Sequence, residues 1–224
     1  MNALAAGVAH EINNPLAGVL GLIQVLRMRT DESTDAKTAK ILSRVETDAQ
    51  RIRDIVSALL SLRDEQEGDK QNVVVAEVVH ATVGLLKAQL EEARIAVRTE
   101  LDESLEVRAN AAQIRTALIH LISNSIAASD AGASIDLSVS DIEGQLVCVK
   151  VKDEGKGIEE EHLARVFEPF YTTKSEWRGR GLGLAMVHRI VEEHNGRVEV
   201  DSTVGVGTTV TIRLPRSAGG AHLT

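Results

Sequence analysis

The sequence predicts an α+β protein in which a helical hairpin is followed by an α/β-sandwich domain. Up to about residue 64, apolar residues recur at helical spacing without any strand pattern. A polar segment with one glycine, 65–71, then separates this region from one where helices alternate with strands of period two. Two of those strands form a hairpin, so we expect a mixed, largely antiparallel sheet with helices on one face. The expected parts are a hairpin (1–66), a linker (67–71), a sandwich domain (72–216) and a tail (217–224).

Composition narrows the class of protein. The chain has 224 residues, of which 43% are hydrophobic and only 2% aromatic, so its cores must be aliphatic. A net charge of −8 argues against a nucleic-acid partner. The single cysteine, Cys148, excludes an internal disulfide framework and fits a reducing compartment, where it acts as a small hydrophobe in a strand. No apolar run approaches the roughly 20 residues that cross a bilayer, so we expect no membrane segment and a cytoplasmic location.

The first helix is expected over about residues 3 to 29. Its apolar stripe comprises Ala5, Val8, Ile12, Leu16, Val19, Ile23 and Leu26. At about 100° per residue, His10 projects away from that stripe, on the side shared by Asn14, Ala17 and Gly21. Pro15 removes a helical hydrogen bond and should bend the helix. An exposed imidazole among small side chains indicates chemistry on His10.

A second helix is expected to continue to about Asp64. It carries apolar residues at near-heptad spacing, namely Ile41, Val45, Ile52, Ile55, Leu59 and Leu62. One hairpin cannot cover both apolar faces, so we expect a homodimer whose two hairpins form a four-helix bundle. The alternative is a coiled-coil linker without chemistry, against which the exposed His10 and the interior Pro15 count.

The second half is expected to contain helices and strands in alternation. Strands are expected at Val73–Val75, Ile95–Leu101, Ser134–Ser140, Gln145–Lys152, Arg197–Ser202 and Thr208–Leu214, and helices at Ala76–Glu92, at Ala111–Ser129 and after Gly181. On the helix at 114–126, the buried stripe is Ile114, Leu118, Leu121, Ile122 and Ser125. His120 and Asn124 lie at its edge, four residues apart, where they can reach a site between helix and sheet.

One strand is expected to end on an inward carboxylate. Val147, Val149 and Val151 point inward, and Asp153 has the same parity. A carboxylate in that position needs hydrogen-bond donors, and the exocyclic amine of adenine would be one. The following glycines, Gly155 and Gly157, allow a tight turn and a close approach to a ligand.

A glycine triplet opens the helix after residue 181. Glycines at a helix start expose backbone N–H groups at the positive end of the helix dipole, which is a natural phosphate cradle. Preceding it, Lys174, Arg178 and Arg180 could meet phosphates or could be solvated loop charges. A Rossmann motif is disfavoured, because the triplet does not follow the first strand and the strand pattern is not parallel.

Five short motifs, in order and followed by a glycine turn, resemble those of sensor histidine kinases of two-component systems. The first is the phospho-acceptor box His10-Glu11-x-x-Asn14-Pro15, and the second is the asparagine box at Asn124. The first glycine box Asp153-x-Gly155-x-Gly157 and the phenylalanine box at 165–174 come next. The second glycine box is Gly181-Leu182-Gly183, and the glycine turn before Thr208 follows it. The resemblance covers about residues 3 to 215. It implies the ATP-binding fold shared with gyrase, Hsp90 and MutL.

The resemblance also implies roles for residues. His10 accepts the γ-phosphoryl group of ATP, and Asn14 assists dephosphorylation of the partner, a response-regulator receiver domain. From its place next to His10 in the chain, Glu11 is the candidate to accept the imidazole proton. Asn124 holds Mg²⁺. The nucleotide is expected on Asn124, Asp153, Gly155, Gly157, Lys174, Gly181, Leu182, Gly183 and Thr208.

Two departures and two rival functions remain at this stage. The family usually has asparagine where this chain has His120, and a small hydroxyl residue where it has Arg180. One rival is an ATPase or protein serine kinase of the same superfamily, and the other is a dimeric scaffold that binds ATP without turnover. Since the first helix would usually begin earlier than Met1, the chain is expected to be the cytoplasmic part of a longer sensor kinase.

Overall fold

The chain divides into two compact units, Met1–Glu67 and Gly68–Thr224. The computed structural model describes residues 19–21, 45, 49, 69–169, 171–172 and 181–217. In the first unit the described residues are helical, and Leu20 and Ala49 are buried against each other. Val19 and Val45, both predicted in apolar stripes, are exposed within the single chain. Among the described residues, no helix is both long and apolar enough to span a bilayer.

The second unit contains the described strands and the longer described helices. In chain order they are β1 (Gln71–Val74), α3 (Val75–Ala93), β2 (Ala96–Leu101), β3 (Glu106–Ala109), α4 (Ala111–Ala128), β4 (Ser134–Ile142), β5 (Leu146–Asp153), α5 (Glu160–Leu163), α6 (Gly183–Glu193), β6 (Arg197–Thr203) and β7 (Gly207–Pro215). Five strands form one sheet in the order β2-β4-β5-β7-β6, and β1 pairs with β3 separately.

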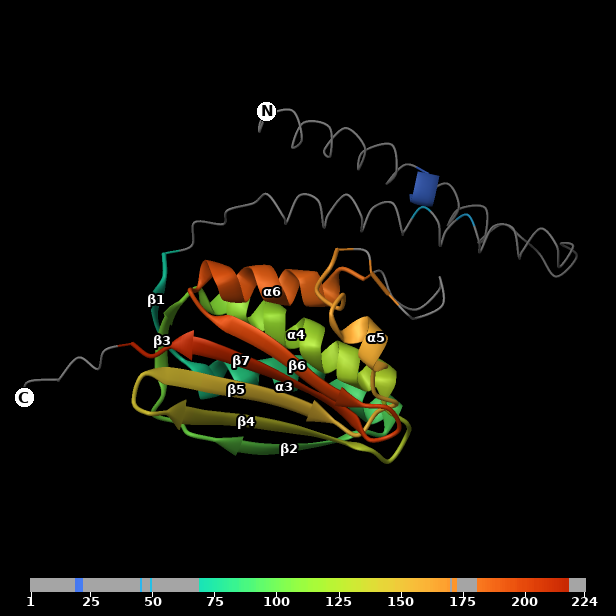
Figure 1. The fold of residues 1–224 in the computed structure, drawn as a ribbon, viewed down its shortest axis with the longest axis horizontal. Coiled ribbons are helices and arrows are strands. Elements are labelled where there is room, and N and C mark those ends of the chain that lie inside the picture. The colour runs from blue at the N-terminus through green and yellow to red at the C-terminus, as the bar shows by residue number, and fades with distance from the viewer. Residues whose placement is uncertain are drawn as a thin grey trace, which may run out of the picture. The chain divides into compact units, whose positions relative to one another are not determined.

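Only one pair in the five-stranded sheet, β2 with β4, is parallel, and the other pairs are antiparallel. Helices α3, α4 and α6 lie on one face of this sheet, with α6 and α4 alongside each other (Figure 1). This arrangement confirms the predicted α/β sandwich with a mixed, largely antiparallel sheet.

The core lies between the sheet and its helices, and it is aliphatic as the composition predicts. Along β5, Val147, Val149 and Val151 are buried against the helices, whereas Lys150 and Lys152 are exposed. Cys148 has the opposite parity and is nevertheless a buried free thiol, so it behaves as a small strand hydrophobe. The β5 parity carries the chain to Asp153 with its carboxylate on the helix-covered side.

Three local features differ from the sequence prediction. Strand β3 and the short helix α5 were not expected, because each spans only four residues and gives little periodic signal. Val75, predicted to end a strand, instead begins α3, where it is fully buried. None of these differences alters α4 or β5, so the frame of the candidate site is as expected.

Candidate functional site

Asp153 is the centre of the candidate site. Its side chain is 5% exposed, and three protein donors converge on its carboxylate. Ser125 Oγ donates to Oδ2 at 2.8 Å, while the backbone N–H groups of Gly155 and Thr208 donate to Oδ1 at 3.0 and 3.1 Å. The predicted inward carboxylate is therefore present, and its hydrogen bonds leave further lone pairs for a ligand donor.

The loop after Asp153 is held tightly on both sides. The Lys156 N–H donates to the Ala128 carbonyl at the end of α4, and the Lys156 carbonyl accepts from the Gly205 N–H in the β6–β7 turn. A Cβ on Gly155 would lie 2.7 Å from the Ala128 oxygen, and one on Gly157 would lie 2.2 Å from the Thr203 oxygen. Both positions require glycine because the backbone comes too close for any side chain.

Helix α4 carries two of the predicted polar residues to the site. Asn110 caps the helix by accepting from the N–H groups of Ala112 and Gln113, and the predicted apolar stripe of α4 is buried. His120 and Asn124 are half-buried at the edge of this stripe. Within the described part of the chain, neither side chain makes a hydrogen bond or ion pair, so both remain available to a ligand.

The start of α6 faces this edge of α4. A Cβ on Gly183 would lie 3.5 Å from both His120 Nδ1 and Asn124 Nδ2. Gly181 has φ +65°, a conformation that favours glycine, and no side chain caps the helix at Leu182. The first backbone N–H groups of α6 thus lack a side-chain acceptor, which suits an anion.

Burial lowers the pKa of His120 below its ordinary value of 6.5. The cause is the loss of hydration on the charged imidazolium. The imidazole is accordingly neutral at physiological pH. One of its two ring nitrogens then carries an N–H donor, and the other carries a lone pair.

Phe167 of the phenylalanine box packs beside α6, and Tyr171 of the same box packs against α5. The Phe167 ring lies 5.2 Å from the His188 ring, and the Tyr171 hydroxyl is 2.6 Å from His162 Nδ1. Arg165 stacks over the Tyr171 ring at 4.2 Å. The chain is therefore anchored immediately before residue 173. Residues 173–180, which include the predicted Lys174, lie outside the described residues.

The structure brings together most of the predicted nucleotide residues. Asp153, Gly155 and Thr208 form one hydrogen-bonded group, Gly157 lies close against the Thr203 backbone, and Asn124 faces Gly183. Thr208 acts through its backbone N–H, while its hydroxyl shares a 2.9 Å hydrogen bond with Ser202. The predicted catalytic residues His10, Glu11 and Asn14 lie outside the described residues.

Two site residues escaped the sequence analysis. Ser125 was predicted only as a buried stripe member, although it is a donor to Asp153. Ser202 Oγ accepts the Ile158 N–H at 2.8 Å and donates to the Gly207 carbonyl at 2.9 Å, which ties the loop after Asp153 to β7. The sequence did contain a signal for Ser125, because a buried hydroxyl on the apolar stripe of a helix needs a hydrogen-bond partner.

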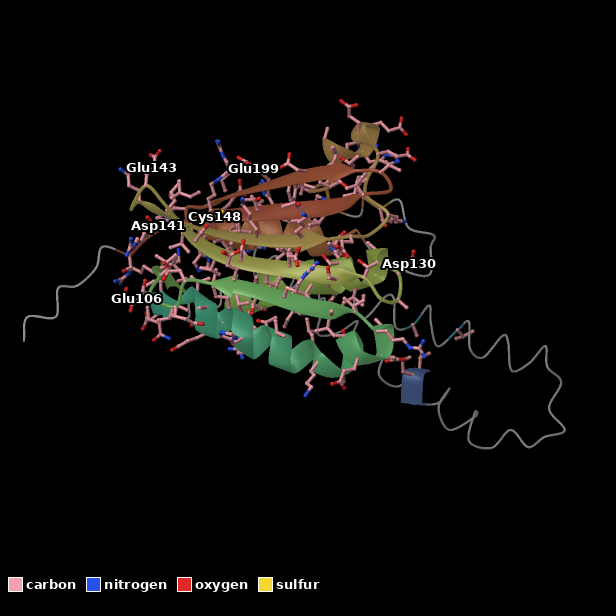
Figure 2. The ribbon with its side chains drawn as sticks, turned by 90° about the horizontal axis from the view of Figure 1, so that it is seen from below. Glu106, Asp130, Asp141, Glu143, Cys148 and Glu199 are labelled. Atoms are coloured by element: carbon pink, nitrogen blue, oxygen red, sulfur yellow. The ribbon has the colours of Figure 1, made fainter. Side chains whose placement is uncertain are left out.

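Acidic side chains lie at both ends of the domain. Glu106, Asp141 and Glu143 lie at one end of the domain, and Asp130 lies at the other (Figure 2). Asp130 marks the site's end, since it follows Ala128, whose carbonyl contacts the loop after Asp153.

Four features of the site together define an ATP-binding domain. They are a buried carboxylate at a strand end, a loop bounded by glycines, an amide at a helix edge and a helix that starts with glycine. The chain matches two family models, "Histidine kinase-, DNA gyrase B-, and HSP90-like ATPase" at residues 109–218 and "His Kinase A (phospho-acceptor) domain" at residues 1–68. The chain belongs to the sensor histidine kinases of two-component signalling.

Individual relatives agree with this assignment. Sporulation kinase E of Bacillus subtilis (strain 168) is 33% identical over 95% of this chain and 28% of its own length. Sensor histidine kinase ZraS of Escherichia coli (strain K12) is 35% identical over 95% of this chain and 45% of its own length. The crystal structure of histidine kinase ThkA in complex with response regulator protein TrrA is 26% identical, with a TM-score of 0.67 over 96% of this chain and 62% of that chain. The chain thus spans less than half of the two kinases matched by sequence.

Proposed function

We propose that this chain is an autophosphorylating protein histidine kinase that passes the phosphoryl group from His10 to an aspartate of a response-regulator receiver domain. The observation that carries the proposal is the presence, in one chain, of a phospho-acceptor domain followed by an ATP-binding domain. His10 lies within the first domain, and the Asp153 site lies within the second.

The reaction begins at the His10 imidazole. One ring nitrogen attacks the γ-phosphorus of ATP, the bond from that phosphorus to the β–γ bridging oxygen breaks, and ADP leaves with the electron pair. Glu11 accepts the proton from the other ring nitrogen. A neutral imidazole is nucleophilic, and an unperturbed histidine side chain is largely neutral at physiological pH.

The second domain positions the nucleotide for this step. Asp153 accepts from the adenine amine, because it is already fixed by three protein donors and has lone pairs left. Gly155 and Gly157 permit close approach of the base, and Gly181, Leu182 and Gly183 offer backbone N–H groups to the phosphates, with Lys174 adding positive charge. Mg²⁺ fits the amide oxygen of Asn124, where it would offset phosphate charge.

The first domain is proposed to be a homodimeric hairpin over residues 1–66, joined by a linker at 67–71 to the ATP-binding domain at 72–216, with 217–224 as a tail. Val19 and Val45 support the dimer, since both belong to predicted apolar stripes and remain exposed in the single chain. A second hairpin would cover them.

The receiver partner is supported by ThkA, whose crystal structure contains a response regulator. We place the docking surface over His10, Asn14, Ala17 and Gly21, where small side chains leave access to the imidazole. Asn14 is proposed to position water for dephosphorylation of the receiver. Asn14→Ala should slow the loss of receiver phosphate, and an unchanged rate contradicts that role.

Incubation with γ-labelled ATP and magnesium tests the kinase activity. Wild type should gain label, His10→Gln should not, and the label should be lost in acid because phosphohistidine is acid-labile. Acid-stable label would indicate a protein serine kinase, release of phosphate without label would indicate an ATPase, and nucleotide binding without turnover would indicate a scaffold.

A further inference from the structure

His120 stands where the family usually has asparagine, and the structure aims it at the candidate nucleotide site. It lies four residues before Asn124 on α4, so both side chains leave the same side of the helix. Their polar ends converge on one place, because a Cβ on Gly183 would be 3.5 Å from an atom of each. The absence of a side chain at Gly183 leaves that place open.

No residue in the described part of the chain bonds to the His120 ring nitrogens. In the second unit, the described residues provide neither a hydrogen bond nor an ion pair to this imidazole, although it is half-buried. The other half-buried or buried histidines differ in this respect. His162 contacts Tyr171, His188 lies 3.2 Å from Glu192, and His194 is bonded through both nitrogens. A partly desolvated imidazole that has no partner among the described residues is available to a ligand.

The chemistry of the pair points to a cation. Two helical side chains four residues apart can share one metal ion, which is the spacing used by helical histidine pairs in zinc enzymes. An amide oxygen suits magnesium, which prefers oxygen ligands and keeps its waters. An imidazole nitrogen suits later first-row transition metals instead, and their affinity for nitrogen rises from manganese to copper.

We propose that His120 supplies a nitrogen ligand to the divalent cation of the bound nucleotide, so that this site favours a transition-metal nucleotide over a magnesium nucleotide. The inference deepens the proposed function and rests on it, because the cation enters this site together with ATP or ADP. An asparagine at position 120 would offer oxygen and would not create this preference.

Calorimetry of the untagged full chain with preformed Co²⁺–ADP and Mg²⁺–ADP tests the preference. The ratio of the two dissociation constants should favour cobalt in wild type, and His120→Asn should reduce that preference by about tenfold, a typical effect of altering a metal site. His80→Asn is the matched control. His80 is an exposed histidine on α3, a different helix, and it pairs with Glu103 at 3.0 Å. An equal ratio in wild type and His120→Asn contradicts the proposal.

Pulsed electron paramagnetic resonance of wild type with Mn²⁺–ADP supplies a test without substitution. Direct ligation predicts a nitrogen coupling that changes when the protein is grown with ¹⁵N-imidazole histidine. No such coupling, with Mg²⁺–ADP still bound, overturns the nitrogen ligand and leaves the kinase assignment standing. Failure to bind either metal–ADP overturns both.

Discussion

Ser125 Oγ on α4 donates a 2.8 Å hydrogen bond to Asp153 Oδ2 at the end of β5. Both side chains are buried, and they join the helix layer to the sheet at the point where the glycine loop begins. This bond makes the position of the carboxylate a property of the fold, since α4 and β5 must be packed together for the donor to reach it.

Ser125→Ala should lower the free energy of unfolding by about 1–3 kcal/mol, because a buried carboxylate loses one of its three donors. Urea denaturation measures this. Ser123→Ala is the control on the same helix, since Ser123 is half-buried and has no hydrogen bond among the described residues. Equal destabilisation by the two substitutions would argue against a specific role for the Ser125 hydroxyl.

Asp153→Asn should weaken ADP binding by at least about tenfold. The amide NH₂ would face the protein donors and the adenine amine, so it replaces an acceptor with a donor of nearly the same shape. Titration calorimetry measures the dissociation constant. Asp136→Asn, at an exposed carboxylate paired with Arg98, should leave it unchanged. An unaltered affinity in Asp153→Asn would remove the carboxylate from nucleotide recognition.

Alanine at two glycines should separate folding from binding. Gly157 has φ +73°, and a Cβ there would lie 2.2 Å from a backbone oxygen, so Gly157→Ala should destabilise the domain by more than about 1 kcal/mol. At Gly183 the nearest atoms are 3.5 Å away, so Gly183→Ala should fold normally and bind ADP less well. Thermal melts measure the stability of both variants, and calorimetry measures their ADP affinity. A stable Gly157→Ala with an unfolded Gly183→Ala would contradict this prediction.

Acid should weaken the domain through His194. The Asn110 N–H donates to its Nε2 at 3.0 Å, so the proton is on Nδ1, which donates to the Ile190 carbonyl at 2.7 Å. Burial lowers the pKa of His194 below 6.5, and Lys70 adds to this lowering, whereas the Ile190 carbonyl and Glu193 oppose it.

The unfolded chain therefore takes up this proton at higher pH than the folded chain, and stability falls as pH drops below about 6.5 through the lowered pKa. Urea midpoints from about pH 7 to about pH 5 should fall more steeply for wild type than for His194→Gln, whose side chain does not titrate. Parallel slopes would show that His194 makes no contribution.

Sequence reasoning reached the parts of the site that periodicity controls. The alternation Val147, Val149, Val151 placed Asp153 inward, and the helical stripe around Leu118 placed His120 and Asn124 at its edge; the burial of these residues confirms both. Periodicity reports which face a residue occupies, and that is sufficient for burial.

The periodicity of the sequence could not identify contacts between residues that are distant along the chain. The bond from Ser125 to Asp153, the approach of Gly183 to His120 and the contact of Asn110 with His194 all depend on how α4 packs on β5 and α6. Strand β3 was missed because it spans only four residues, too few for a periodic signal, and its pairing with β1 depends on a segment far back in the sequence.

The position of the phosphoryl group tests the whole account most directly. After incubation of the full chain with ATP and magnesium, peptide mapping at alkaline pH should find phosphate on the His10 imidazole, and Asp153→Asn should abolish it. Phosphate on a serine or threonine, or an unphosphorylated His10 in a chain that hydrolyses ATP, would contradict the assignment.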